Sequence, residues 1–112
     1  RRIVAVFQPH LPSRTRDLMH EFASALSHEF ADAVFVTDIY LAREAPIPGV
    51  SSEVLANAVA ALPDAPTVVR YVPNKADLPD ALAAFVQPGD VVITLGAGDI
   101  RAAGEGVLAR LV

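Results

Sequence analysis

The sequence predicts one α/β domain in which helices flank a mainly parallel sheet. Two observations carry this prediction. Four short apolar runs rich in Val, Ile and Phe have the composition of strands buried on both faces. Between the runs lie segments whose apolar residues recur every three or four positions, as on one side of a helix. Strands and helices that alternate in this way form right-handed crossovers and a parallel sheet.

Composition limits the classes of function. A chain of 112 residues without internal repeats has the size of a single domain. A net charge of −4 and a pI near 5.2 argue against a nucleic-acid partner, which requires a basic surface. The absence of cysteine excludes disulfides, thiolate metal ligands and thiol catalysis. No apolar run approaches the ~20 residues that cross a bilayer, so we expect no membrane partner.

The order of elements can be predicted from the apolar runs and the turn residues between them. Strands are predicted at Ile3–Phe7, Ala33–Val36, Thr67–Val72 and Val91–Leu95. Helices are predicted from about Thr15 to Phe30, from Ser51 or Ser52 to Leu62, from Asp77 to Val86, and from Asp99 or Ile100 to Leu111. The expected N-caps are Ser13 or Thr15, Ser51 or Ser52, and Asp77.

Ligands of such sheets bind beyond the carboxyl ends of the strands, which makes residues 8–16, 37–50 and 96–101 the candidate segments. The first segment leads into a helix N-terminus, where N–H groups and the helix dipole favour an anion. Arg14 adds a guanidinium suited to a carboxylate or phosphate, and His10, Ser13 and Thr15 add neutral donors. Arginines in a first turn oppose the dipole by ~0.3–1 kcal/mol each, a cost that an anion offsets. The alternative is a purely structural turn with solvated arginines.

The second segment begins with Asp38 just beyond a strand end, a common position for a functional carboxylate, and continues to Tyr40. The structural alternative is loop closure, in which Asp38 accepts local N–H groups and Arg43 pairs with Glu44 or Asp38. Both interpretations remain open from the residues alone.

The third segment contains Gly96, Gly98 and Asp99, and it begins like a dinucleotide fingerprint. The third glycine of that fingerprint would fall at Arg101, which argues against a nicotinamide or flavin site. A tight turn or a close approach of the backbone to a ligand explains the glycines better. The sequence has no G-x-x-x-x-G-K-[ST] phosphate loop and no pair of His or carboxylates with metal-ligand spacing, so we expect no metal site.

Three sequence blocks, taken together, resemble one family. Their order and spacing are similar to those of the C-terminal domain of UDP-N-acetylmuramate–L-alanine ligases, which are Mur ligases. The blocks are Val4–His10 with Ser13–Asp17, Thr37–Tyr40 with Ala42–Glu44 and Pro46–Val50, and Leu95–Ile100. The resemblance implies a Rossmann-like three-layer sandwich, with residues 1–112 forming the amino-acid-receiving domain of a larger three-domain enzyme. A start without Met agrees with this expectation.

The resemblance further implies a cytoplasmic bacterial enzyme of peptidoglycan synthesis. In this family ATP phosphorylates the carboxylate of UDP-N-acetylmuramate, and the amine of L-alanine attacks the acyl phosphate. The N-terminal domain holds the UDP sugar, and the central domain carries the ATP phosphate loop, the catalytic Lys and the Mg²⁺ ligands. We therefore expect no catalytic residue, no cofactor and no ligase activity in residues 1–112 alone, with the other two domains as partners in the same chain.

The resemblance assigns roles to individual residues. Arg14 would bind the carboxylate of L-alanine or the charge on the acyl phosphate, and His10 would support its loop. The expected substrate-binding residues are His10, Arg14, Thr15, Asp38 and Tyr40, with Gly96, Gly98 and Asp99 as a ligand-approach loop. Many members have Arg-Tyr where this chain has Leu11-Pro12, so one basic contact is lost.

Other functions remain compatible with the sequence. One is a stand-alone module that binds a small anionic metabolite. Another is the same domain of a related Mur ligase that adds a different amino acid or a peptide. A third is a purely structural domain.

Overall fold

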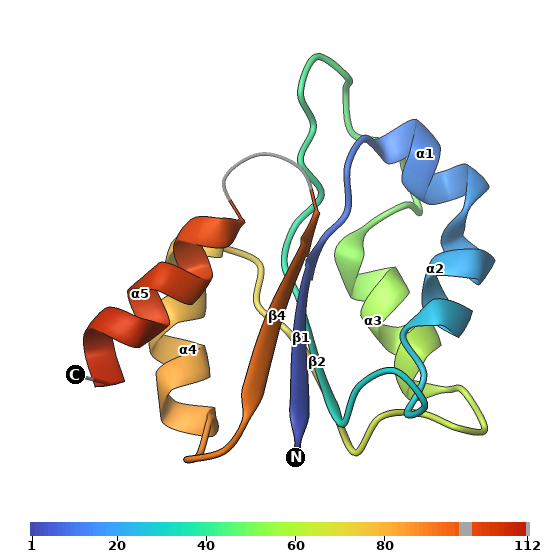
Figure 1. Cartoon of the computed structure of the whole chain (residues 1–112). Helices are drawn as coiled ribbons and strands as arrows, with labels where there is room; N and C mark the ends of the chain where they lie inside the picture. Colours follow the sequence, from blue (N-terminus) through green and yellow to red (C-terminus); the bar gives the residue numbers. More distant parts are fainter. Residues whose placement is uncertain (97–99, 112) are drawn as a thin grey trace.

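The computed structural model describes residues 1–96 and 100–111, and only the backbone of residues 101, 102, 110 and 111. In this part of the chain four strands form one parallel sheet in the order β3-β2-β1-β4. Figure 1 labels β4, β1 and β2 of this sheet. The strands are β1 (Ile3–Gln8), β2 (Ala33–Val36), β3 (Val68–Tyr71) and β4 (Val91–Gly96). All four predicted strands are therefore present, with ends shifted by one residue at most.

Helices cover both faces of the sheet, which confirms the predicted α/β sandwich. On one side lie α1 (Pro12–Asp17), α2 (Met19–Ala25) and α3 (Ser52–Ala60). On the other lie α4 (Leu78–Phe85), which follows a 3₁₀ turn at Lys75–Asp77, and α5 (Arg101–Leu111). None of the helices in the described residues combines the length and apolar character that a membrane span requires.

The two central strands are buried on both faces, as their composition predicts. Val4, Val6 and Phe35 face α4 and α5, whereas Ala5 and Val34 face α2 and α3. These five side chains are at most 1% exposed. The alternation follows from the two-residue period of a strand, and it gives the sheet one apolar core on each side.

The first predicted helix differs from the structure. Instead of one helix from Thr15 to Phe30, the chain forms α1 and α2, which are separated at Leu18 and end at Ala25. The helix begins earlier than predicted, at Pro12. Proline suits a first helical position because the N–H that it lacks would have no partner within the helix.

The predicted caps are correct at one helix of three. Ser51 caps α3 by accepting the Val54 N–H at 3.1 Å. Neither Ser13 nor Thr15 caps α1, whose N-cap position is Leu11, and the Asp77 side chain does not cap α4. Asn74 instead caps the 3₁₀ turn before α4, accepting the Ala76 N–H at 2.9 Å.

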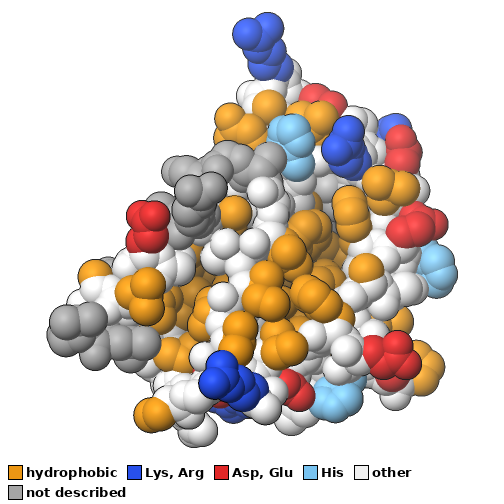
Figure 2. All heavy atoms as spheres, viewed as in Figure 1, with side chains coloured by type: hydrophobic (Ala, Val, Ile, Leu, Met, Phe, Trp, Pro, Cys, Tyr) orange, Lys and Arg blue, Asp and Glu red, His pale blue; other side chains and the backbone are white. Residues whose placement is uncertain are grey.

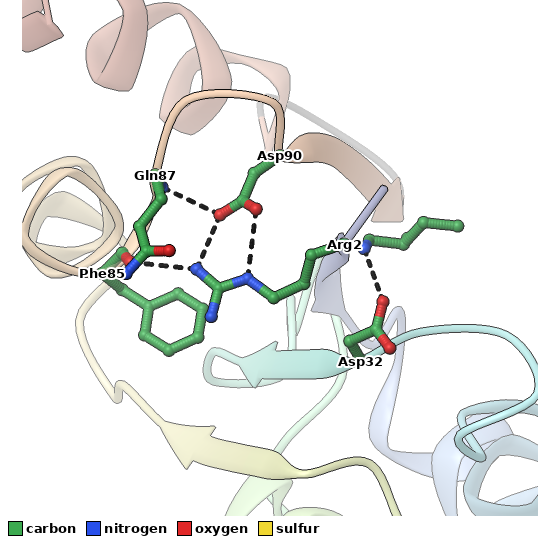
Figure 3. A network of polar contacts seen from close by, with 6 residues as sticks. Arg2, Asp32, Phe85, Gln87 and Asp90 are labelled. Atoms are coloured by element: carbon green, nitrogen blue, oxygen red, sulfur yellow. Dashed lines mark hydrogen bonds and ion pairs between the residues drawn. The ribbon is translucent and has the colours of Figure 1, made fainter.

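An ion pair joins the start of β1 to the turn between α4 and β4. The Arg2 guanidinium donates to both carboxylate oxygens of Asp90, at 3.1 and 2.7 Å, and lies 4.5 Å from the centre of the Phe85 ring (Figure 3). Asp90 also accepts the Gln87 N–H at 2.8 Å. These bonds hold the pKa of Asp90 below, and that of Arg2 above, its ordinary value. This network lies at the amino ends of β1 and β4, away from the candidate segments.

One part of the sheet face remains uncovered by helices. Because α2 ends at Ala25 and β4 lies at the sheet edge, apolar side chains gather at the surface between them (Figure 2). They line a hollow of about 340 Å³, formed by Phe7, Phe22, Ala25, Leu26, Phe30 and Leu95. Phe7 and Phe22 pack with their ring centres 5.4 Å apart.

Replacing Asp90 by Asn should lower the thermal unfolding midpoint at neutral pH, because the ion pair and the acceptor for the Gln87 N–H are both weakened. Since the folded-state pKa of Asp90 is depressed, its contribution is complete above the ordinary Asp pKa and disappears as the pH falls through the lower folded value. The melting midpoints of the two proteins should therefore begin to approach one another only below about pH 4, and they should meet once the pH is below the depressed pKa of Asp90. Asp64→Asn, at an exposed carboxylate, is the control; equal losses in both variants would contradict this account.

Candidate functional site

The candidate site lies where the strands end, at the edge toward which all four strands point. There the parallel pairing of β1 and β2 continues beyond the sheet as a single bridge between His10 and Tyr40. Tyr40 N–H donates to Pro9 O at 2.8 Å, and Leu11 N–H donates to Tyr40 O at 2.9 Å. The rings of His10 and Tyr40 stack at 5.6 Å. The first two candidate segments are thus brought side by side.

A carboxylate from the second segment binds the helix start in the first. Glu44 accepts the Ser13 N–H at 2.9 Å and the Ser13 hydroxyl at 2.7 Å. These two bonds are the main reason why the pKa of Glu44 is lowered, and electrostatic interactions with Arg16 and His10 lower it further. The anion that the sequence predicts at this helix N-terminus is therefore supplied, at Ser13, by the chain itself.

The turn before α1 is held in an unusual backbone conformation. Leu11 has φ of 68°, in the left-handed region that non-glycine residues rarely adopt. Thr15 is fully buried, and both its N–H and its hydroxyl donate to Leu11 O, at 3.0 and 2.9 Å. The Thr15 hydroxyl thus closes the turn that carries Arg14, and it does not face solvent.

Arg14 is the available cation of this turn. Its side chain is exposed, and within residues 1–96 and 100–111 it has no hydrogen-bond or ion-pair partner. Arg16, two residues later, differs because its guanidinium donates to Asp17 at 2.9 Å. Arg14 lines a shallow depression with Leu11, Ser13, Asp17 and Leu18. An unpaired guanidinium in this place can bind a planar anion such as a carboxylate.

Asp38 and Tyr40 line a different feature, an open groove of about 580 Å³ beyond the ends of β1, β2 and β3. Gln8, the last residue of β1, also lines it and is 5% exposed. Its Oε1 is buried without a partner among the described residues, which is rare for a buried polar atom. Sequence analysis did not single out Gln8, although a polar residue closing a buried strand is a signal that could have identified it.

Asp38 is fixed from the neighbouring strand. The Tyr71 hydroxyl, at the end of β3, donates to the Asp38 carboxylate at 2.5 Å, and Asp38 N–H donates to Pro73 O at 3.2 Å. The bond to Asp38, together with burial, raises the pKa of Tyr71 to about 12. The loop-closure alternative predicted local N–H donors to Asp38, whereas the donor seen among the described residues is the Tyr71 hydroxyl from the neighbouring strand. The expected pairing of Arg43 with Glu44 or Asp38 is absent from the described residues, since Glu44 binds Ser13.

Gly96 sits where only glycine fits. It has φ of 138°, and a Cβ atom at this position would lie 2.5 Å from Gln8 O on the adjacent strand. The backbone of Gly96 therefore approaches the chain's own strand β1 closely, whereas the predicted approach to a ligand stays a prediction. Gly98 and Asp99 lie outside the described residues. Within the described residues, no group of three His, Asp or Glu side chains could hold a metal ion.

Comparison with known proteins identifies the class. Residues 1–98 match the family model of the Mur ligase, glutamate ligase domain, and the chain belongs to the Mur ligase family. It is similar to UDP-N-acetylmuramate–L-alanine ligases of individual bacteria. The Cutibacterium acnes ligase is 59% identical over 92% of this chain, and the Rubrobacter xylanophilus ligase is 53% identical over 98%. The matched regions make up 21% and 24% of those two proteins, so the chain spans about a quarter of their length or less.

Replacing Asp38 by Asn should lower the pKa of Tyr71 from about 12 toward the ordinary tyrosine value near 10, because the charged acceptor of its hydroxyl is removed. The ring-carbon NMR signal of labelled tyrosine reports this ionisation directly. Glu53→Gln is the matched control and should lower the pKa less, since Glu53 acts only through its more distant charge. Ionisation of Tyr71 near pH 10 in the unaltered protein would show that the short bond to Asp38 is not formed.

Proposed function

We propose that the chain is the amino-acid-receiving domain of a longer, three-domain ligase that joins L-alanine to UDP-N-acetylmuramate with ATP, in the cytoplasm of a bacterium that builds peptidoglycan. The observation that carries the proposal is the guanidinium of Arg14, which has no partner among the described residues and lies on a turn held at the carboxyl edge of the sheet. The reaction class is supported by sequence similarity, because proteins that bear this ligase name align with 92% or more of the chain.

In the proposed reaction this domain binds and orients one reactant. Arg14 holds the carboxylate of L-alanine, or neutralises the charge on the acyl phosphate that the alanine amine attacks. Such a group accelerates the reaction by fixing the position of the amine and by stabilising negative charge, without transferring a proton. His10, stacked on Tyr40, and Thr15, bonded to Leu11, keep the Arg14 turn in place.

The remaining assigned residues form the surroundings. Asp38 and Tyr40 shape the groove beside the turn, in which we expect part of the amino acid or of the nucleotide sugar to lie. The ligand-approach role of Gly96, Gly98 and Asp99 stays a prediction from the sequence. Because the turn and the groove face the same sheet edge, the domain would close over reactants held by the rest of the polypeptide.

Neither ATP nor Mg²⁺ has a recognisable binding site among the residues that the structure describes. The sequence contains no phosphate loop, and the described residues contain no group of acidic or histidine side chains that could hold a metal ion. We therefore propose that both bind mainly outside this domain, and that residues 1–112 alone have no ligase activity.

Arg14→Ala in the longer protein should raise the KM for L-alanine, or lower kcat, by at least about tenfold, because a charge-assisted bond to the substrate is lost. Steady-state kinetics with each of the three substrates varied in turn provides the measurement. Arg16→Ala is the matched control, since Arg16 already pairs with Asp17 in the same helix. Unchanged kinetics in the Arg14 variant would contradict the proposal. A tenfold effect seen with a different amino acid only would assign the domain to a related Mur ligase.

A further inference from the structure

We propose that Glu44 is a positioning residue for the amino-acid substrate: it holds the turn that carries Arg14 and acts on substrate binding through Arg14, without touching the substrate. This inference rests on the proposed function and extends it to a residue on a different segment. It also gives the loop of residues 37–50 a specific task, which is to fix the geometry of the neighbouring turn.

The contacts around Arg14 carry the inference. The Arg14 turn is anchored at two points by the same loop. At its start, Leu11 N–H donates to Tyr40 O, and at its end both donors of Ser13 bind the Glu44 carboxylate. Arg14 directly follows Ser13, so the direction of its backbone is set one residue earlier by Glu44. The bonds between Ser13 and Glu44 span 31 positions of sequence, and no other side chain in the described residues binds Ser13.

The charge of Glu44 separates its role from that of Arg14. An ionised carboxylate at the first turn of α1 satisfies the Ser13 N–H and offsets the positive end of the helix. An incoming carboxylate therefore meets an amide that is already bonded, and the guanidinium of Arg14 remains as the group that can receive it. Glu44 in this way restricts where the substrate anion binds, as well as holding the turn.

Loss of the Glu44 side chain should change the geometry of the Arg14 turn more than it changes the free energy of unfolding. Glu44 is half-buried and Ser13 lies near the surface, so both donors of Ser13 can turn to water when the carboxylate is removed. The turn would then lose its second anchor while Leu11 still strains it through a positive φ. A small displacement of a group that positions a substrate strongly reduces the contribution of that group to catalysis.

A double-mutant cycle in the longer protein tests the inference. Glu44→Ala should raise the KM for L-alanine at least about fivefold, with the KM values for ATP and UDP-N-acetylmuramate changed less than about twofold. In an Arg14→Ala background, Glu44→Ala should add less than about a twofold further change, because residues that act through one another are not additive. Thermal unfolding of each variant reports whether the fold is retained.

Three further variants make the result decisive. Glu44→Gln keeps an oxygen that accepts the Ser13 N–H and should restore most of the lost affinity. Ser13→Ala removes only the hydroxyl bond, so it should raise the same KM by a smaller factor. Glu21→Ala removes an exposed carboxylate in α2 and should leave the kinetics unchanged. If Glu44→Ala unfolds the protein, the KM values of the Gln and Ser13 variants provide the test.

The outcomes distinguish the two proposals. If Arg14→Ala has no effect on kinetics, the proposed function of the turn is wrong. If Arg14→Ala weakens alanine binding and the Glu44 and Ser13 variants do not, the function stands and the role of Glu44 is overturned. Fully additive effects of Arg14→Ala and Glu44→Ala would also overturn it, since Glu44 would then act independently of Arg14.

Discussion

The bonds between Glu44 and Ser13 are the constraint on which the geometry of the candidate site depends. Parallel pairing of β1 and β2 brings two loops to the same edge of the sheet, but sheet pairing alone ends at the bridge between His10 and Tyr40. Beyond that bridge, the carboxylate of Glu44 joins the second loop to Ser13 at the start of α1. As a result, an exposed arginine that has no partner in the described part of the chain is carried by a backbone segment fixed at both ends.

The two edges of the sheet have different roles. At the amino edge, Arg2 and Asp90 form a closed network in which each charge has a partner, and this network joins the start of β1 to the turn before β4. At the carboxyl edge, Arg14 lacks a partner in the described residues, and the buried Gln8 Oε1 is unsatisfied there. A buried polar atom without a partner is unusual, and the carboxyl edge is where parallel sheets of this class bind their ligands.

Local sequence patterns were sufficient to predict the sheet and the region of the site. The four strands were predictable because each is a short apolar run between turn residues, and the strand ends located residues 8–16 and 37–50 as neighbours. Periodicity alone did not predict the split between α1 and α2. It also did not predict an N-cap position at Leu11, because the Ser13 N–H donates to the distant Glu44 carboxylate and no local side chain caps the helix. Glu44 itself was considered only as a partner for Arg43. Its true partner lies 31 residues away, a separation that no local pattern reports.

Hydrogen exchange at the Ser13 amide tests most directly whether the two loops form one unit. The account predicts a protected Ser13 amide in the unaltered protein, and rapid exchange after Glu44→Ala while the Leu11 amide, bonded to Tyr40, stays protected. Exchange of the Ser13 amide at the rate of an unstructured peptide in the unaltered protein would contradict the account, because the carboxylate of Glu44 would then not hold the turn.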